Sequence, residues 1–272
     1  MKNFLFLIIA IIPRNYFGLI LKFFFELKSP KFIVSIMKYL FVFFYRVDLS
    51  DSEFPAEHYD SVQSLFCRRL KLNSRKLGNG LVSPVDGYIS ESGLINNDML
   101  IQAKNINYKL DKLLPSEYSK IFSNGWYCTI YLAPYNYHRI HSPVSGFVES
   151  FYYQPGDFWP VNSLTINKVK GLFNINERIS TIINTKDYSV CIVKVAAMGV
   201  GNIVLSYLNY NKYSIGLNKM ENPLKINKFD EIGMFAFGST VILLCNAKVD
   251  YNIGVSLKNK IINAGETLFN IH

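Results

Sequence analysis

The sequence predicts a β-rich α+β protein, with apolar, amphipathic N-terminal helices followed by a barrel- or sandwich-like domain. Residues 1–46 are dominated by three apolar stretches, whereas the chain after Asn73 consists of short apolar or alternating runs separated by Gly, Pro and Asn. Many short runs between turn signals are typical of a β-rich domain. An internal Ser-Pro-x-x-Gly repeat in this second part further indicates a barrel or sandwich with two equivalent corners.

The length and the charge of the chain limit the number of domains and indicate the kind of surface that it can contact. The 272 residues suffice for one large domain or two small ones, each with a hydrophobic core. The chain carries 29 basic and 20 acidic residues, a net charge of +9. We expect a membrane-associating helical segment at residues 1–47 and a main domain at residues 48–272.

The cysteines give no sign of a zinc site or a disulfide framework. They lie far apart in the sequence, each within or beside an apolar run, and no Cys-x-x-Cys pair occurs. We therefore expect four free, core-forming thiols and a reducing compartment. The four residues are Cys67, Cys128, Cys191 and Cys245.

The N-terminal segment is typical of a chain that lies on a membrane. Its apolar stretches, residues 4–13, 16–25 and 32–45, are shorter than the roughly 20 residues that a spanning helix needs. Seven basic residues against one acidic residue give this segment a charge of +6. Apolar helical faces edged with Lys and Arg favour the headgroup layer of an anionic membrane. A signal peptide and a buried helical hairpin remain alternatives, whereas nucleic-acid binding is disfavoured.

The main domain begins with a polar connector, after which apolar residues at helical spacing predict a helix over residues 61–72. The rest of the chain reads as strands with turns between them. Strands are expected at residues 87–89, 126–132, 146–153, 190–195, 203–208, 241–245 and 251–255.

The internal repeat contains one informative difference. The first copy reads Ser-Pro-Val-Asp-Gly-Tyr-Ile over residues 83–89, and the second reads Ser-Pro-Val-Ser-Gly-Phe-Val over residues 142–148. Each copy supplies a proline-fixed extended entry and a glycine turn before a strand. Such units also open lipoyl-like modules, so the repeat alone fits a carrier or a structural module. Asp86, which Ser145 replaces in the second copy, requires another explanation.

A Gly-Ser bond inside an apolar run is the first chemical candidate. Gly238 and Ser239 are followed by a predicted strand, and Ser239 opens the C-terminal segment of residues 239–272. Glycine in a strand usually marks a bend or a close approach. The Ser239 hydroxyl can reach the Gly238 carbonyl, a geometry that permits an N→O acyl shift. A simple bulge or turn is the alternative.

Two of the four histidines stand three residues apart, directly before the second repeat. His138 and His141 could bind a metal, but no third ligand with suitable spacing is evident, and acid–base chemistry suits histidine better. Asp86, one of these histidines and Ser239 supply the components of an Asp-His-Ser relay. No Gly-x-Ser-x-Gly motif is present, so a relay directed at the chain itself is the better interpretation. His58 and His272 are expected to be solvated.

Six segments, in family order between residues 83 and 240, resemble the proteobacterial-type phosphatidylserine decarboxylases, which are pyruvoyl enzymes. Three departures stand out: Phe237 where the family usually has Leu, an altered segment at residues 195–202, and a short chain after Ser239. The matching segments are SPVDG (83–87), YHRIHSPVSG (137–146), GDFWPVN (156–162), GLFNINERI (171–179), VAAMGVGNI (195–203) and DEIGMFAFGST (230–240).

The resemblance implies a role for each site residue. Asp86, His141 and Ser239 match the self-processing triad, and His138 matches the residue assigned to decarboxylation. Cleavage between Gly238 and Ser239 is expected to give a β chain, residues 1–238, and an α chain, residues 239–272, that stay associated. The α chain then begins with a covalent pyruvoyl group derived from Ser239, which accepts the electrons released as CO2 leaves. No metal is implied.

The resemblance also implies a substrate and a location. The implied reaction is the decarboxylation of phosphatidylserine to phosphatidylethanolamine. The implied location is the cytoplasmic face of the inner membrane, with the protein peripheral or monotopic. A homo-oligomer is left open, and no nucleic-acid partner is expected. Arg139 and Arg178 are candidates for binding the substrate phosphate. The alternatives are a pyruvoyl decarboxylase acting on a soluble amino acid and a non-catalytic, membrane-attached β-barrel module.

Overall fold

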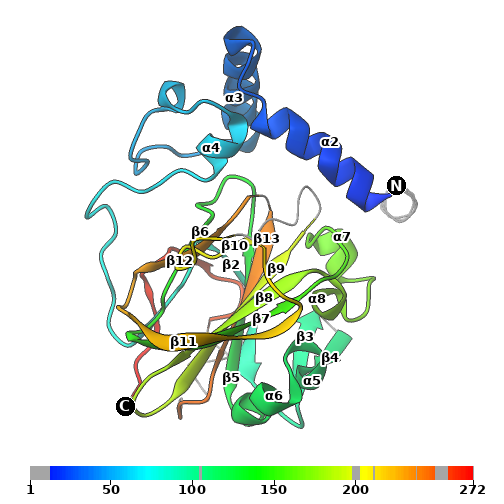
Figure 1. The fold of residues 1–272 in the computed structure, drawn as a ribbon, viewed down its shortest axis with the longest axis vertical. Coiled ribbons are helices and arrows are strands. Elements are labelled where there is room, and N and C mark those ends of the chain that lie inside the picture. Colours follow the sequence, from blue (N-terminus) through cyan, green and yellow to red (C-terminus); the bar gives the residue numbers. More distant parts are fainter. Residues whose placement is uncertain are drawn as a thin grey trace.

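An antiparallel sheet of eight strands forms the centre of the protein in the computed structural model (Figure 1). The structure describes residues 13–103, 106–197, 203–210, 212–236, 238–248 and 257–271. Most of the first apolar stretch, the strand expected at 251–255, Phe237 and His272 lie outside these residues. In order across the sheet, the strands are β11 (Gly216–Ile226), β7 (Gly146–Gln154), β8 (Arg178–Asn184), β9 (Ser189–Ala196), β13 (Ser239–Cys245), β5 (Trp126–Leu132), β2 (Gly87–Leu94) and β14 (Ile261–Ile262).

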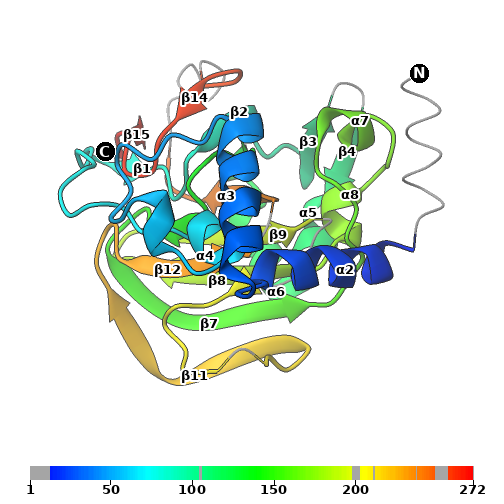
Figure 2. The same ribbon diagram turned by 90° about the horizontal axis from the view of Figure 1, so that it is seen from above.

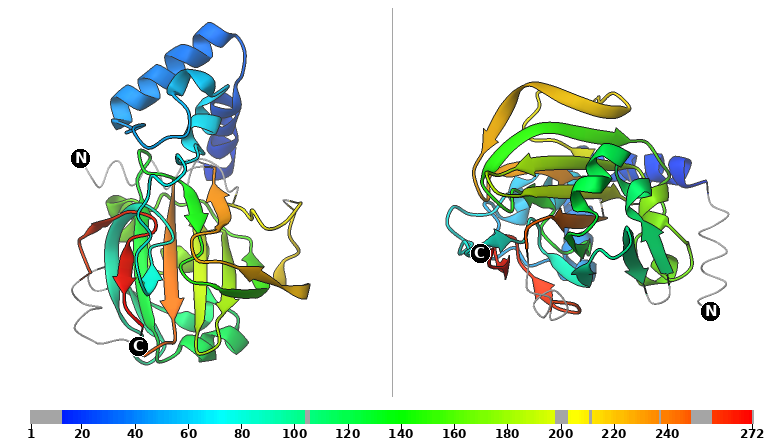
Figure 3. Two further views of the ribbon diagram at one scale, coloured as in Figure 1. Left: turned by 90° about the vertical axis from the view of Figure 1, so that its left-hand side faces the viewer. Right: turned by 90° about the horizontal axis from the view of Figure 1, so that it is seen from below.

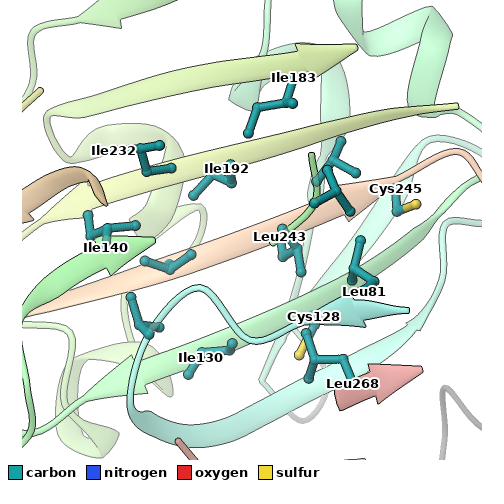
Figure 4. Close-up of a cluster of buried hydrophobic side chains, with 14 of the residues drawn as sticks. Leu81, Cys128, Ile130, Ile140, Ile183, Ile192, Ile232, Leu243, Cys245 and Leu268 are labelled. Carbon is teal, nitrogen blue, oxygen red and sulfur yellow. The ribbon is translucent and has the colours of Figure 1, made fainter. Parts of the chain in front are cut away.

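Both faces of this sheet are covered. One face packs against two smaller sheets, and the side chains between the layers form the main core (Figure 4). These sheets are β10 (Ile203–Val204), β12 (Glu231–Phe235) and β6 (Arg139–His141), and β1 (Leu81–Val82) with β15 (Thr267–Phe269). A second apolar cluster lies on the other face. It involves β3 (Met99–Ala103), β4 (Ile106–Lys109), α5 (Leu110–Leu113), α6 (Ser116–Phe122), α7 (Ser163–Ile166) and α8 (Leu172–Ile175).

The two-sided covering explains why the central strands read as nearly continuous apolar runs, because both of their faces are buried. The predicted β-rich α+β fold is confirmed, as are four free cysteines, three of them fully buried. The strand expected over residues 203–208 is shorter than predicted. Only residues 203–204, strand β10, form a ladder, and their partner is β12. The next backbone N–H, that of Leu205, donates to the Tyr213 hydroxyl (3.0 Å).

The N-terminal helices form a cap over one end of the sheet (Figures 1 and 3). The cap consists of α2 (Arg14–Glu26), α3 (Lys31–Tyr45), η1 (Ala56–His58) and α4 (Val62–Phe66). Phe41 of α3 packs with Leu65 and Phe66 of α4, and Figure 2 shows the two helices side by side. The cap cluster therefore includes residues on both sides of the expected boundary at residue 47.

The helix expected over residues 61–72 is much shorter in the structure. It begins with a capping box between Ser61 and Ser64 and ends at Phe66. The carbonyls of the next two residues, Cys67 and Arg68, accept hydrogen bonds from Arg139 Nε (2.9 and 3.3 Å). Contacts with β6 thus replace the helical pattern, a tertiary effect that local spacing does not encode.

The basic residues of the cap are less available to a membrane than the sequence suggests. Lys38 is buried, and its ammonium donates to the carbonyls of Ala56 (2.9 Å) and Tyr59 (2.5 Å). Lys28 forms an ion pair with Asp60 (2.7 Å). Lys38 is therefore not one of the basic residues at the border of an exposed apolar helical face, where the sequence predicts that the Lys and Arg residues of this segment lie. Among the described helices, none is both long and apolar enough to cross a membrane.

Candidate active site

Ser239 is the first residue of the central strand β13. It pairs with Leu132 of β5 on one side and with Ala196 of β9 on the other. The residue is fully buried, and its Oγ has no hydrogen-bond partner among the described residues. A buried hydroxyl without a partner is unfavourable and calls for an explanation. Participation in a reaction with the neighbouring backbone supplies one.

Gly238 directly precedes β13, at a point where residues of the helical cap lie over the chain. It lines a cavity of about 250 Å³. A Cβ atom at Gly238 meets no described atom within 4 Å, so this glycine does not reflect a close approach. The Gly-Ser bond therefore joins an open apolar cavity to a buried strand. Most of the cap residues that line the cavity are aromatic: Phe25, Phe41, Tyr45 and Phe66, with Leu21.

His138 is held as a neutral base at the start of β6. Its ring packs against that of Phe66 (centroids 3.9 Å apart, planes tilted by 33°), and its Nδ1–H donates to the Asn136 carbonyl (2.9 Å). This tautomer leaves a lone pair on Nε2, which is buried and has no partner among the described residues. Burial lowers the pKa of His138 to about 3, and the positive charge of Arg68 acts in the same direction. The side chain is therefore neutral at neutral pH, with the Nε2 lone pair unprotonated.

His141 has partners at both ring nitrogens. Nδ1–H donates to the Phe229 carbonyl (2.8 Å), and Nε2 accepts a hydrogen bond from the Tyr137 hydroxyl (2.8 Å). The Tyr137 and Phe229 rings stack against the imidazole. Burial lowers the pKa of His141, so this histidine is also neutral near pH 7. The Nε2 lone pair is therefore occupied by the Tyr137 hydroxyl.

Asp86 is buried and bound to groups other than a histidine. Its Oδ2 accepts from Arg75 Nη2 (2.8 Å), and its Oδ1 accepts from the Ala264 N–H (2.7 Å). Burial raises the pKa of Asp86, and the charge of Arg75 opposes this effect. His141 meets the Asp86 segment through the backbone, where its N–H donates to the Pro84 carbonyl (2.8 Å). The structure thus places the two residues on adjoining segments without bonding carboxylate to imidazole.

Sequence reasoning missed three residues around this site. Tyr137 bonds to His141, Arg75 bonds to Asp86, and Arg68 is buried beside the loop that carries His138. For Arg68, the available signal was the pair of arginines, Arg68 and Arg69, at the end of an apolar helical pattern. Which of the pair turns inward depends on where α4 ends, and local spacing did not predict that end.

The two arginines that the sequence suggested for phosphate binding are already engaged. Arg139 donates to both carboxylate oxygens of Glu231 (2.8 Å each) and to two backbone carbonyls. Arg178 is buried and donates to four backbone carbonyls, those of Lys112, Leu113, Asn174 and Asn176. Both guanidinium groups hold segments of the fold together.

The fold and the site define a class: a β-rich α+β protein with a buried serine beside a cavity roofed by apolar helices. Comparison with known proteins narrows the class. The sequence profile of the phosphatidylserine decarboxylase family matches residues 62–270. The chain belongs to this family.

Several bacterial proteins named phosphatidylserine decarboxylase proenzyme are similar over most of their length. The Myxococcus xanthus protein is 38% identical over 211 residues, which cover 75% of each chain. The Brevibacillus brevis protein is 39% identical over 235 residues, 82% of this chain and 84% of the relative. The Saccharophagus degradans protein is 34% identical over 256 residues, 90% and 89% of the two chains.

Proposed function

We propose that this protein decarboxylates phosphatidylserine to phosphatidylethanolamine with a pyruvoyl group made from its own Ser239. The position of the Gly238-Ser239 bond is the main observation behind this proposal. The bond joins a buried, unpartnered hydroxyl to an apolar cavity roofed by the helical cap. A self-processing serine and a lipid substrate both suit that position.

Maturation begins when Ser239 Oγ attacks the Gly238 carbonyl and its proton passes to a neutral imidazole. The peptide bond becomes an ester, and β-elimination then releases Gly238 as a new carboxylate and leaves dehydroalanine at residue 239. Water hydrolyses its imine tautomer, ammonia leaves, and residue 239 becomes the pyruvoyl group. We assign the proton transfer to His141, whose partner Tyr137 lies within the electrostatic influence of the Asp86 carboxylate. Both histidines are neutral because burial lowers their pKa values.

We assign decarboxylation to His138. The pyruvoyl group supplies an electron sink for the bond that breaks when CO2 leaves. The free Nε2 lone pair of His138 can take the proton that the substrate ammonium must lose, and the same nitrogen can then protonate the carbon that CO2 leaves. Phe66 links this histidine to the cavity, because its ring packs against His138 and also lines the space beside Gly238.

The two product chains stay together because cleavage occurs at the start of β13. That strand is paired along its whole length with β5 and with β9, and the cut changes only its first residue, so the ladder of residues 240–245 is kept. The α chain of residues 239–272 also contributes β14 and β15, which pair with β2 and β1 of the β chain. We therefore propose a mature protein of two interlocked chains, 1–238 and 239–272.

The helical cap is proposed to attach the protein to the cytoplasmic face of the inner membrane. Helices α2 and α3 expose large apolar side chains on their outer surfaces, including Tyr16 (71% exposed) and Phe44 (72%). Contiguous exposed apolar residues of this kind mark contact with a membrane or a partner. The same helices line the Gly238 cavity, so a lipid can meet the site while its acyl chains stay in the bilayer. This link favours a phospholipid over a soluble amino acid.

Intact-mass analysis of Ser239→Ala tests the proposal. The wild type should separate under denaturing conditions into two chains, the smaller of which spans residues 239–272 and has a blocked N-terminus, and the variant should remain a single chain. Ser180→Ala is the matched control, because Ser180 is equally buried in the same sheet, and it should still be cut. Cleavage of Ser239→Ala at the wild-type position contradicts self-processing. CO2 release from free serine but not from serine phospholipid contradicts the lipid substrate.

A further inference from the structure

Within the part of the chain that the structure describes, Arg68 is a buried cation without an anionic partner. Its side chain follows the end of α4, is 3% exposed and donates from Nη2 to the Tyr135 carbonyl (3.1 Å). Its Nε and Nη1 are buried without a partner among the described residues. The nearby carboxylates of Asp51 and Asp86 both pair with Arg75 instead (2.7 and 2.8 Å). A buried guanidinium with unused donors is unfavourable unless an anion completes the site.

The guanidinium is located beside the proposed decarboxylation residue. Arg68 is bound to the Tyr135 carbonyl and His138 to the Asn136 carbonyl, two successive peptide groups of one loop. Phe66, two residues before Arg68, packs against His138 and lines the Gly238 cavity. The end of α4 therefore presents an apolar ring toward the cavity and an unsatisfied cation next to the imidazole.

We propose that Arg68 binds the phosphodiester of the substrate headgroup, an inference that rests on the proposed function. A planar guanidinium with two free donors suits a pair of phosphate oxygens. The substrate carboxylate is the poorer ligand, because an ion pair with it stabilises the ground state and is lost when neutral CO2 forms. The phosphodiester keeps its charge throughout, so binding it does not oppose the reaction.

This assignment predicts an effect on binding and little effect on turnover. An interaction that is equal in ground state and transition state changes KM and leaves kcat. Loss of two charge-assisted hydrogen bonds weakens binding by about 10- to 100-fold. Arg68→Gln should therefore raise the KM for dihexanoyl phosphatidylserine by that factor, with kcat changed less than about threefold.

Two competitive inhibitors of the mature two-chain enzyme separate the anions. Dihexanoyl phosphatidylmethanol carries the phosphodiester without amine or carboxylate, and O-methylserine carries amine and carboxylate without phosphate. Arg68→Gln should raise the inhibition constant of the first by about 10- to 100-fold and leave that of the second unchanged. Arg69→Gln removes the same charge from the exposed neighbouring position and should leave both constants within about twofold.

Three results overturn the inference: a change confined to O-methylserine, which makes Arg68 a carboxylate ligand; no change with either inhibitor; or an equal change with both, which indicates a distorted site. If Arg68→Gln does not fold, Arg68→Lys tests whether the guanidinium binds the phosphodiester. This variant keeps the charge without the planar fork, and it should bind phosphatidylmethanol several-fold more weakly; unaltered binding rejects the proposal. Failure of the proposed function is distinguishable, because the wild type itself is then uncut or inactive on phosphatidylserine.

Discussion

The two copies of the Ser-Pro-x-x-Gly unit have the same backbone design. Ser83 and Ser142 each donate a hydroxyl hydrogen bond to the carbonyl two residues on, at 2.6 Å in both copies. A Cβ at Gly87 lies 2.5 Å from the Tyr131 carbonyl oxygen, and one at Gly146 lies 2.5 Å from that of Asn184. Glycine is required in both copies for the same reason, a backbone that approaches too closely for a side chain.

The two copies also bind to each other in a reciprocal manner. The N–H of Val82, before the first copy, donates to the Pro143 carbonyl (3.2 Å), and that of His141, before the second, donates to the Pro84 carbonyl (2.8 Å). The predicted equivalence of the two corners is therefore visible as a pair of matching hydrogen bonds. The side chains at these two matched positions differ in chemical character: the second copy has the imidazole of His141 where the first has the apolar Val82.

The second difference between the copies is that the first has Asp86 where the second has Ser145. Both accept a backbone N–H from a facing turn, of Ala264 (2.7 Å) and Lys228 (2.9 Å) respectively. Only Asp86 also binds an arginine, Arg75. A neutral hydroxyl thus meets the structural requirement in the second copy. The comparison indicates that the scaffold does not need a buried carboxylate at residue 86, and we propose that its charge serves the chemistry.

The largest predicted effect is at the histidine that breaks the symmetry. His141→Ala should slow maturation by about 10²- to 10⁴-fold, because Ser239 loses the base that takes its proton. His58→Ala is the control, since His58 is exposed on the cap and should not matter. The measurement is the rate at which the chain of residues 239–272 is released after synthesis. Maturation of His141→Ala at the wild-type rate removes this histidine from the mechanism.

His138→Ala sharpens the division between the two histidines. It should be cut, because His141 remains, and the mature enzyme should lose about 10²- to 10⁴-fold in decarboxylation. Normal turnover by a fully cut His138→Ala enzyme, measured as CO2 release, shows that His138 is not the proton-transfer group.

Asp86→Ser converts the first copy into the second. The hydroxyl can still accept from Ala264, so the fold should persist, whereas maturation should slow by at least about tenfold as the histidine loses its orienting charge. The pH dependence has a defined sign. Burial raises the pKa of Asp86. The folded state therefore holds this proton more tightly than the unfolded chain, and the resulting stability is present at low pH and lost as the pH rises through the raised pKa.

Maturation and stability should consequently respond to acid in opposite directions. Lowering the pH protonates Asp86, which slows maturation and stabilises wild type relative to Asp86→Ser. Maturation rates and urea unfolding between about pH 5 and pH 8 measure the two effects, the unfolding in the uncut Ser239→Ala background. Identical pH profiles for wild type and Asp86→Ser contradict the proposed role of the carboxylate.

The two glycines test whether the corners are energetically equivalent. Gly87→Ala and Gly146→Ala should each destabilise the uncut protein by about 3 kcal/mol, because the new methyl group meets a carbonyl oxygen that cannot move away. Gly93→Ala, in β2, is the control: a Cβ there lies an ordinary 3.8 Å from the Tyr127 ring, so it should change stability by less than about 1 kcal/mol. Unequal losses at the two corners argue against equivalence.

The smallest predicted effect is at the neutral member of the pair. Ser145→Ala removes the hydrogen bond to Lys228 and should cost about 1 kcal/mol of stability. Maturation should be unaffected, because Ser145 carries no charge toward the site. Slowed maturation in this variant, at unchanged stability, shows that the two copies do not divide structure from chemistry as we infer.

Much of the fold was predictable because it is encoded in local patterns. The strand expected over residues 126–132 coincides with β5, and the strand expected over residues 146–153 is β7 without its last residue. Apolar runs bounded by Gly, Pro and Asn determine such strands wherever the chain folds. The resemblance carried by short motifs likewise led to the right family.

The site was less predictable because its geometry depends on long-range contacts. Asp86 pairs with Arg75, and His141 with Tyr137, where the sequence suggested that Asp86 and His141 bond directly. The Gly238 cavity exists because α2 and α3, which come from the other end of the sequence, cover the start of β13.

The sequence by itself determined the strands, the repeat, the Gly238-Ser239 bond and the two histidines, since each depends on residues within a few positions of one another. Only the tertiary structure decided that α4 ends at Phe66, that Arg68 is buried without an anionic partner among the described residues, and that Arg139 and Arg178 are engaged. The physical reason is that a hydrogen-bond donor takes whichever acceptor the folded chain brings to it, and those acceptors come from distant segments.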